Sequence, residues 1–446
     1  MTLSVGTATA IITPPVGTWL EGYGGKDHGS VGVHDDLYAH ALVVDDGDTT
    51  VGLVSCDLLG VDRKLVEQAR RIAAEATGME PERIMVAATH THQGPAGLRF
   101  DADDELMDVT ARAIAGAIAQ AHAARRPAVL KLGSTTVESI MQNRRHPDWP
   151  VDADLHVLLF DHVDPLQPPI AALVNGACHP TVLYSDNYLI SADYPGHAVR
   201  VVEGTFPGIG MQFFNGACGN VNPNWIKQTH EEAQRVGAVV GSAAARLIAE
   251  LRPLGHTHHA DNIRWSEHIE KPVTAGELIE DVRLRVASRN VDLPIKTYLS
   301  DEEYLAKLGE YQTELDALSD ALDSEQRRPI MAQLNRYRTE RTAAKRMRSR
   351  EGHELHPELM AVAFSPNLAL LGLPGEWFVE TVAEIRESID IERLLVACYA
   401  NHYMGYVVPE GAYEEGGYEP GVSLLAPEAE AIAKSAAIDL MKEVTA

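Results

Sequence analysis

Short apolar runs alternate with longer amphipathic stretches through residues 1–265 of the chain. The amphipathic stretches repeat apolar residues at spacings of three and four, which predicts helices at Arg63–Thr77, Glu105–Ala124 and His230–Glu250. The apolar runs have the length of buried strands. These predicted strands are Ala41–Val44, Val51–Cys56, Ile84–Ala88, Ala128–Leu132, Leu155–Phe160, Ile170–Asn175 and Gly210–Asn215. The alternation predicts an α/β fold with layered mixed β-sheets flanked by helices.

The pattern changes at about residues 301–350, where two narrow apolar seams follow one another. The first contains Leu308, Tyr311 and Leu315, and the second contains Leu334 and Tyr337. Asp and Glu are frequent around the first seam and Arg around the second, so the two arms attract when they lie side by side. This pattern predicts an inserted antiparallel helical hairpin. The alternative is a lid, or an arm through which the chain forms a homo-oligomer.

Strand-like sequence returns after the hairpin. It predicts strands at Ala361–Phe364, Leu368–Leu373 and Leu394–Ala400, a helix at Trp377–Ile389, and a last helix that begins near Pro427. We find no repeats, low-complexity tracts or long linkers. We therefore expect one domain over residues 1–446, with the hairpin inserted in it.

The composition of the chain limits the classes of partner that it can bind. The chain has 446 residues, 45% of them hydrophobic, with 38 Lys and Arg against 64 Asp and Glu and a formal charge of −26. Such a charge repels phosphate backbones and anionic membrane surfaces, so we expect no nucleic-acid partner and no stable membrane association. The first residues show no basic or apolar targeting pattern, which predicts a cytoplasmic location. The four cysteines form no CxxC pair, and we expect them to be reduced and buried.

Two histidines follow the predicted strand Ile84–Ala88. His90 and His92 lie two residues apart, and in extended chain such residues share a face, so both rings can converge on one ion. The Gly94-Pro95 pair ends the strand and leaves the histidines at an open edge. The pair therefore predicts a catalytic metal site, and the alternative is a hydrogen-bonded strand end.

Polar residues stand at the ends of three further predicted strands. His179 follows residues 171–176, Asn220 and Asn222 follow residues 211–216, and Glu376 follows residues 368–373. The strand ends of α/β sheets are where sites assemble. Taken singly, His179 is equally explained as a core histidine, and Glu376 as a carboxylate of a first helical turn.

Taken together, these segments resemble the catalytic domain of the neutral, non-lysosomal ceramidase family over nearly the whole chain. The resemblance is carried by Thr89-His90-Thr91-His92 with Gly94-Pro95, Cys178-His179, Gly216 to Pro223, Pro374-Gly375-Glu376 and Asn401 to Tyr406. It implies a zinc ion held by His90, His179, Glu376 and Tyr406, a donor set suited to zinc.

The resemblance also implies catalytic roles. His92 would face the substrate carbonyl as general acid or base, Tyr418 would donate a hydrogen bond to developing charge, and Arg144 would lie in the pocket. The family motif Gly-Asp-Val-Ser-Pro reads Gly219-Asn220-Val221-Asn222-Pro223 here. Asparagine cannot act as the nucleophile, so we expect Asn222 to orient water or an oxyanion.

These residues predict a zinc-dependent hydrolase that cleaves the N-acyl type amide bond of a small or moderately sized polar substrate with metal-activated water. The alternatives are a zinc-dependent esterase or lyase on the same scaffold, or a non-catalytic metal-binding interaction protein. The family's secretion signal and its C-terminal immunoglobulin-like domain have no counterpart here, which argues against a membrane sphingolipid. Arg144, Arg145, His146 and Trp149 are suited to an anionic or polar group, or else lie at the surface.

Other polar residues have two interpretations each. Asp57 and Asp193 either orient the ligand histidines or serve in turns and caps. His34 either lines the pocket or begins a strand. The remaining group, His256, His258 and His259, has no cysteine partner and is interpreted as a solvated loop.

Overall fold

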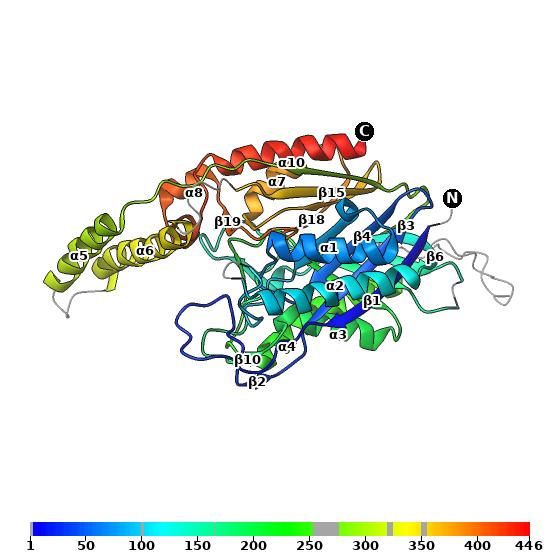
Figure 1. Cartoon of the computed structure of the whole chain (residues 1–446), viewed down its shortest axis with the longest axis horizontal. Helices are drawn as coiled ribbons and strands as arrows, with labels where there is room; N and C mark the ends of the chain where they lie inside the picture. The colour runs from blue at the N-terminus through cyan, green and yellow to red at the C-terminus, as the bar shows by residue number, and fades with distance from the viewer. Residues whose placement is uncertain (1–2, 100–101, 165, 253–275, 319–323, 349–354) are drawn as a thin grey trace, which may run out of the picture.

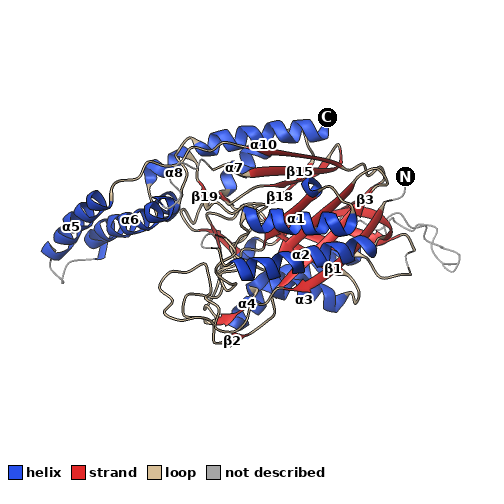
Figure 2. Cartoon of the chain, viewed as in Figure 1, coloured by secondary structure: helices blue, strands red, loops and turns tan. Residues whose placement is uncertain are grey.

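A computed structural model of the chain describes residues 3–99, 102–164, 166–252, 276–318, 324–348 and 355–446. Two β-sheets pack face to face, and helices cover the outer face of each, so the described core has four layers (Figures 1 and 2). The predicted layered α/β architecture is confirmed. The predicted group His256, His258 and His259 lies outside the described residues.

The larger sheet has nine strands in the order β11-β9-β8-β6-β1-β3-β4-β5, with β13 also paired to β6. Its strands are β1 (Ser4–Ile11), β3 (Tyr38–Asp45), β4 (Thr50–Cys56), β5 (Ile84–Ala88), β6 (Arg126–Thr136), β8 (Asp154–His162), β9 (Ala171–Gly176), β11 (Gly210–Asn215) and β13 (Gly276–Ile279). Most neighbours are antiparallel, whereas β4 with β5 and β9 with β11 are parallel. Both parallel pairs end at the candidate site.

The smaller sheet has four strands in the order β14-β15-β16-β18. They are β14 (Arg285–Asn290), β15 (Glu358–Ser365), β16 (Leu368–Gly372) and β18 (Arg393–Ala397). Alternate residues of β15 face opposite layers: Met360 and Val362 pack between the sheets with Leu42, whereas Leu359 and Ala361 belong to the outer core beneath the helices. This period of two is the expected pattern for a strand buried on both faces.

Four helices cover the larger sheet and two cover the smaller one (Figure 1). The first set is α1 (Arg63–Thr77), α2 (Asp104–Ala123), α3 (Asp193–Thr205) and α4 (His230–Leu251), and the second is α7 (Val379–Glu387) and α10 (Ala429–Thr445). Capping explains the sharp ends of α1, because the Asp62 side chain accepts from the Lys64 amide and Gly78 ends the helix with φ of 76°. Shorter elements are η1 (Pro81–Arg83), η2 (Glu138–Ile140), α8 (Glu410–Glu415) and α9 (Tyr418–Val422).

The predicted hairpin is present as α5 (Asp301–Ala317) and α6 (Ser324–Arg348), which lie side by side and project from the core (Figure 1). The Arg341 guanidinium donates to both carboxylate oxygens of Asp301, at 2.7 and 2.9 Å, and the Tyr311 and Tyr337 rings stack 5.7 Å apart. These contacts confirm the predicted attraction between an acidic and a basic arm. The role of the hairpin as an arm between two copies stays a prediction.

Three two-stranded ladders shape the site: β2 (Gly32–Val33) with β10 (Leu189–Ile190), β7 (Met141–Asn143) with β12 (Val221–Pro223), and β17 (Glu376–Trp377) with β19 (Tyr406–Val407). In the last ladder Glu376 is the direct register partner of Tyr406. Backbone pairing therefore makes neighbours of Glu376 and Tyr406, the two implied ligands that lie thirty positions apart in the sequence.

Helix α3 was not predicted, and the predicted helix at Trp377 begins only at Val379, after β17. Pro195 and Gly196 lie in the first turn of α3, where proline needs no amide hydrogen, although both residues argue against a helix when the sequence is scanned. Among the described residues, no helix combines the length and apolarity that crossing a bilayer requires.

Candidate metal centre

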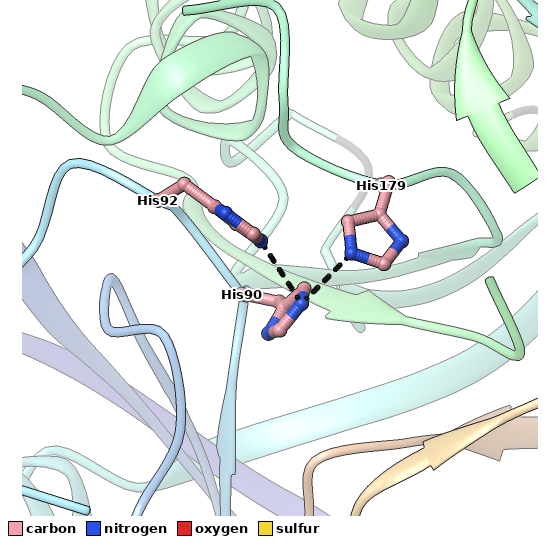
Figure 3. A group of neighbouring side chains, drawn as sticks. All are labelled: His90, His92 and His179. Carbon is pink, nitrogen blue, oxygen red and sulfur yellow. Dashed lines mark hydrogen bonds between the residues drawn. The ribbon is translucent and has the colours of Figure 1, made fainter. Parts of the chain in front are cut away.

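Three buried imidazoles converge where the parallel strands end. His90 and His92 follow β5, and His179 follows β9. The Nε2 atom of His90 lies 3.0 Å from that of His179 and 3.2 Å from that of His92 (Figure 3). All three rings offer a ligand atom within 4.8 Å of the others, so the buried group is compatible with a metal site.

Main-chain carbonyls orient two of the three rings. The Nδ1 atom of His90 lies 2.6 Å from the Leu59 carbonyl oxygen, and that of His179 lies 2.8 Å from the Cys218 carbonyl oxygen. A carbonyl only accepts hydrogen bonds, so each Nδ1 carries the hydrogen and each Nε2 turns a lone pair toward the other. Burial lowers the pKa of His179 well below its usual range, and the neighbouring His90 ring lowers it further. With the hydrogen on Nδ1 of each ring, the two Nε2 lone pairs face each other, an arrangement that a cation between them stabilises.

The Glu376 carboxylate completes this group. Its Oε2 atom lies 3.3 Å from His90 Nε2 and 3.5 Å from His179 Nε2, and it has no hydrogen-bond partner among the described residues. The Tyr403 hydroxyl donates to the other oxygen, Oε1. Burial acts to raise the pKa of Glu376, but the His90 ring and the Tyr403 hydroxyl hold it down, at about 2. A buried, ionised oxygen beside two imidazole lone pairs fits a divalent metal with nitrogen and oxygen ligands.

His92 differs from the other two histidines. Its Nδ1 atom is buried without a hydrogen-bond partner among the described residues, and its ring packs against the Tyr23 ring with centroids 4.9 Å apart. Burial lowers the pKa of His92 well below its usual range, and the His90 and His179 rings lower it further. The structure thus places His92 beside the centre with one nitrogen that no protein group orients.

Arg144 links Tyr406 and Asn222. Its guanidinium donates to the Tyr406 hydroxyl at 3.0 Å and to the Asn222 side-chain oxygen at 3.3 Å. It also donates to the Glu419 carboxylate at 2.7 Å, and Arg145 donates to the other oxygen of Glu419 at 2.9 Å. Arg145 also faces Glu415 at 2.9 Å, so two carboxylates balance the two guanidinium charges. Arg144 therefore holds Tyr406 in place, and the two arginines leave little positive charge for an anionic substrate.

His146 and Trp149 stack on each other with ring centroids 3.7 Å apart, and His146 faces Glu415 at 3.2 Å. Trp149 is 42% exposed. The sequence left two interpretations of this segment, a subsite for an anionic or polar group and a position at the surface. His146 and Trp149 fit the surface position, because both are accessible to solvent and His146 already has a carboxylate partner.

The first asparagine of the altered motif has a structural role. The Asn220 side chain is buried, donates to both oxygens of Glu380 at 3.0 and 2.7 Å, and accepts from the Val379 amide at 3.1 Å, at the start of α7. An aspartate there would oppose the Glu380 carboxylate, which accounts for the amide in this chain.

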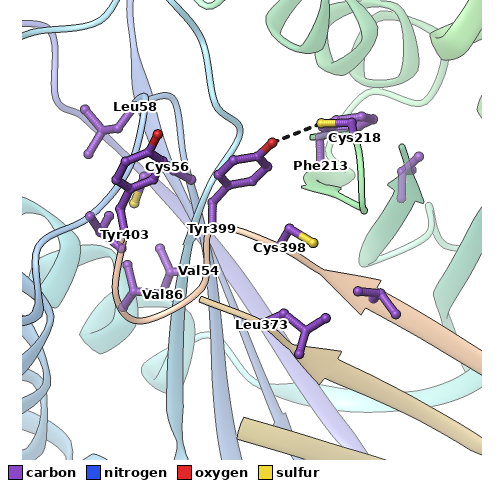
Figure 4. Close-up of a cluster of buried hydrophobic side chains, with 14 of the residues drawn as sticks. Val54, Cys56, Leu58, Val86, Phe213, Cys218, Leu373, Cys398, Tyr399 and Tyr403 are labelled. Atoms are coloured by element: carbon purple, nitrogen blue, oxygen red, sulfur yellow. Dashed lines mark hydrogen bonds between the residues drawn. The ribbon is translucent and has the colours of Figure 1, made fainter. Parts of the chain in front are cut away.

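Two tyrosines near the centre were missed in the sequence. Tyr399 stacks on His90 with centroids 4.0 Å apart, and its hydroxyl lies 3.0 Å from Cys218 Sγ, within a packed cluster under the site (Figure 4). Tyr403 holds Glu376. In the sequence, the tyrosine-rich loop after β18 is the signal that could have found them. In the structure, Tyr399 and Asn401 of this loop both adopt φ of 59°. His90 is also in the left-handed region, with φ of 74°, and such conformations cluster at functional sites.

The centre opens into a cavity of about 650 Å³. His90, His92 and Glu376 line it, as do the Tyr406 and Tyr418 rings, which meet edge to face. Arg144 and Asn222 are not among the described lining residues. Part of the wall comes from the hairpin helix α6, through Arg338, Thr339, Thr342 and Ala343.

The two aspartates support loops instead of rings. Asp57 accepts from the Tyr38 amide at 3.0 Å and from the Thr89 hydroxyl at 3.3 Å, so it holds the residue before His90. Asp193 accepts from the Leu183 and Tyr194 amides at 2.9 and 2.6 Å. The turn interpretation is therefore the one that the contacts of both residues favour.

His34 lies in a second cavity, of about 540 Å³, with Asp35 and His197. Asp35 already accepts from Ser191 and the Ala192 amide, and the Arg200 guanidinium lies 2.8 Å from His197 Nδ1. This cationic neighbour and the saturated carboxylate make the group a hydrogen-bond network. The four cysteines are free and buried, as predicted.

Comparisons of the sequence with known proteins point to the neutral ceramidases. The model "Neutral/alkaline non-lysosomal ceramidase, N-terminal" matches residues 3–243, more than half of the chain. The neutral ceramidase of Mycobacterium tuberculosis is 26% identical over 95% of this chain and 74% of its own length, and that of Pseudomonas aeruginosa is 23% identical over 94% and 69%. Both matches run across the hairpin as well as the sheets.

Solved structures show the same fold. The crystal structure of neutral ceramidase from Pseudomonas aeruginosa superposes with a TM-score of 0.74 at 21% identity, covering 100% of this chain and 75% of that one. A structure described as ceramidase complexed with C2 gives a TM-score of 0.72 at 19% identity. The described sheets and helices therefore form the fold seen in these two structures.

Proposed function

This chain belongs to the neutral/alkaline non-lysosomal ceramidase family, and from that premise we propose that it is a metal-dependent hydrolase of an N-acyl amide bond. One observation carries the proposal: the lone pairs of His90 and His179 and the unpartnered Glu376 oxygen point to one place at the surface of a cavity. A buried cation position with access from a cavity is the arrangement that metal-assisted hydrolysis requires.

We propose zinc as the metal, with His90, His179, Glu376 and Tyr406 as ligands. Two imidazoles, a carboxylate and a phenol are nitrogen and oxygen donors that suit zinc. When bound, zinc supplies Lewis-acid polarisation of the scissile carbonyl and lowers the pKa of water toward about 7. Burial raises the pKa of Tyr406 well above its usual range, so Arg144, which donates to its hydroxyl, is the group that favours phenolate there.

The chain's own residues would divide the remaining work. His92 has one nitrogen that no protein group holds, which suits a side chain that takes up and releases a proton. Tyr418 lines the cavity beside Tyr406 and would donate a hydrogen bond to charge that develops on the carbonyl oxygen. Arg144 and Asn222 act behind Tyr406 as positioning residues.

The substrate class follows from the relatives and the cavity. The curated relatives are neutral ceramidases, and ceramide is an N-acyl amide. Trp19, Leu20, Tyr23 and Leu424 give the cavity an aromatic and apolar lining, which suits an acyl chain. We further propose a cytoplasmic location without stable membrane association, in keeping with the charge of −26, and a homo-oligomer through the hairpin.

Metal content and turnover, measured together, test the proposal. Wild-type protein purified without an affinity tag should carry near-stoichiometric zinc by inductively coupled plasma mass spectrometry, and should release fatty acid from short-chain ceramides and other N-acyl amides. His179→Ala and Glu376→Ala should lose both the metal and the release, whereas His122→Ala, on α2 away from the site, should keep both. Release from esters alone would favour the esterase alternative. Wild-type protein that takes up no offered metal would overturn the mechanism.

A further inference from the structure

The hairpin contributes one side chain to the candidate active-site cavity whose charge no described group balances. Helix α6 lines the cavity through Arg338, Thr339, Thr342 and Ala343, and α6 also packs on α9, the helix that carries Tyr418. The hairpin is therefore part of the cavity that contains His90 and Glu376, not a separate appendage.

Most polar atoms on this part of the wall are already engaged. The Thr339 hydroxyl donates to the Asn335 carbonyl at 2.7 Å, and the Thr342 hydroxyl donates to the Arg338 carbonyl at 3.0 Å. Ala343 is apolar and buried. Of these four side chains, only the Arg338 guanidinium has hydrogen-bond donors left for a ligand.

The nearby carboxylates are engaged as well. On α6 itself, Glu340 faces Arg336 at 2.9 Å and Lys296 at 3.6 Å. On α9, Glu419 faces Arg144 and Arg145. Within the described part of the chain, Arg338 has no carboxylate at ion-pair distance, although it is exposed on the cavity side of α6.

The other charged residues of the described lining already face partners. Arg99 pairs with Glu21 at 2.6 Å, so these two charges cancel. Glu376 faces His90 and His179. Among the described charged side chains of the lining, Arg338 thus remains as the guanidinium without a carboxylate partner, and a guanidinium binds a carboxylate through two parallel hydrogen bonds.

We infer that Arg338 forms an anion subsite of the candidate active site, and that the preferred substrates are N-acyl amides whose amine part carries a carboxylate, such as N-acyl amino acids. This inference rests on the proposed function. It assigns to the hairpin a role in substrate choice: the acyl chain occupies the aromatic and apolar lining, and the anionic end of the substrate pairs with α6.

A matched pair of ligands tests the subsite. N-dodecanoylglycine carries the carboxylate, and N-dodecanoylglycinamide has the same acyl chain and scissile amide without it. Binding by isothermal titration calorimetry and turnover are measured for wild type, Arg338→Gln, Arg338→Lys and Lys345→Gln. Lys345 is the control, because it is an exposed cation on the same helix and does not line the cavity.

Arg338→Gln should raise Kd and KM for N-dodecanoylglycine about tenfold, with kcat and the values for the glycinamide changed by less than about twofold, since a contact made equally in ground and transition states affects KM alone. Arg338→Lys should recover part of the loss, and Lys345→Gln should match wild type. Equal effects on both ligands, or no effect on either, would overturn the subsite.

Two further outcomes separate the subsite from the proposed function. If wild type hydrolyses neither ligand nor any ceramide, the amidase proposal fails, and the difference in Kd between the two ligands still decides the subsite. If N-dodecanoylglycine binding is lost in EDTA but unchanged in Arg338→Gln, the carboxylate binds the metal centre, and the subsite is refuted.

Discussion

The Nε2 atoms of His90 and His179 lie 3.0 Å apart although 89 positions separate the two residues, and a main-chain carbonyl holds the opposite nitrogen of each ring. The carbonyls fix both tautomers, so two lone pairs face one another in a buried place. Two such acceptors repel in the absence of a shared cation or proton. The fold is therefore built around a positive charge at this point, and its removal has consequences for stability as well as activity.

The first prediction concerns metal and thermal stability. A ligand that binds only the folded chain stabilises it by about 4 kcal/mol when present at a thousandfold excess over its Kd. EDTA should therefore lower the Tm of the wild type by several degrees, and added zinc should restore it. His90→Ala should show no response to either addition, whereas His122→Ala should respond as the wild type does. A wild-type Tm that ignores both EDTA and zinc contradicts the metal centre.

The second prediction isolates the hydroxyl that holds Glu376. Tyr403 donates to Oε1 and leaves Oε2 directed at the histidines, so it orients a ligand without being one. Tyr403→Phe should weaken zinc binding by roughly 10- to 100-fold, the usual effect of removing an outer hydrogen bond to a ligand. The measurement is competition with a chelator of known affinity. Tyr311→Phe, in the hairpin, is the control, and equal affinities in the two variants would refute the role of Tyr403.

Much of the architecture was predictable from the sequence because burial periodicity is a local property. The strand ends also located His90, His92, His179 and Glu376 correctly as a group. A shared sheet edge does not explain their meeting, because β5 and β9 run in opposite directions in the larger sheet and Glu376 lies in the separate ladder of β17 and β19. The Leu59 and Cys218 carbonyls, by contrast, are set by the paths of loops, and no residue pattern marks a carbonyl.

The position of the hairpin against the rest of the protein was not predictable, because it does not depend on a local residue pattern. Its seams and charges predict that α5 and α6 pair, but its position against α9 and the cavity depends on packing between segments far apart in the chain. Helix α3 was missed because Pro195 and Gly196 mask a helical first turn.

The third prediction concerns the asparagine that replaces the family's aspartate. Asn220→Asp removes two donors from Glu380 and sets a buried carboxylate against it, which should lower the free energy of unfolding by about 2 kcal/mol. Adding Glu380→Gln should recover most of the loss, because an amide can donate to the new carboxylate. Asn222→Asp, beside the Arg144 guanidinium, is the control and should cost less. Urea unfolding measures all four proteins, and equal losses for the two aspartates would exclude the Glu380 explanation.

The last prediction is a pH dependence of stability that arises at Asp193. Burial raises the pKa of this carboxyl from an ordinary value of 3.8 to about 7, against the backbone hydrogen bonds from Leu183 and Tyr194. Between these two values the folded chain holds a proton that the unfolded chain has lost. The contribution of Asp193 is therefore fully present below pH 3.8, declines as pH rises toward about 7, and is constant above that, with a slope of up to about 1.4 kcal/mol per pH unit.

Asp193→Asn removes this titration, and asparagine tolerates the φ of 53° found there. Urea unfolding at a series of pH values between about 4 and 8 should therefore give a variant that gains stability relative to wild type as pH rises, and the difference should level off near pH 7. Asp186→Asn, at an exposed aspartate, should run parallel to wild type throughout. If the Asp193→Asn curve also runs parallel to wild type, the carboxyl keeps an ordinary pKa in the folded chain, and its two backbone donors outweigh the cost of its burial.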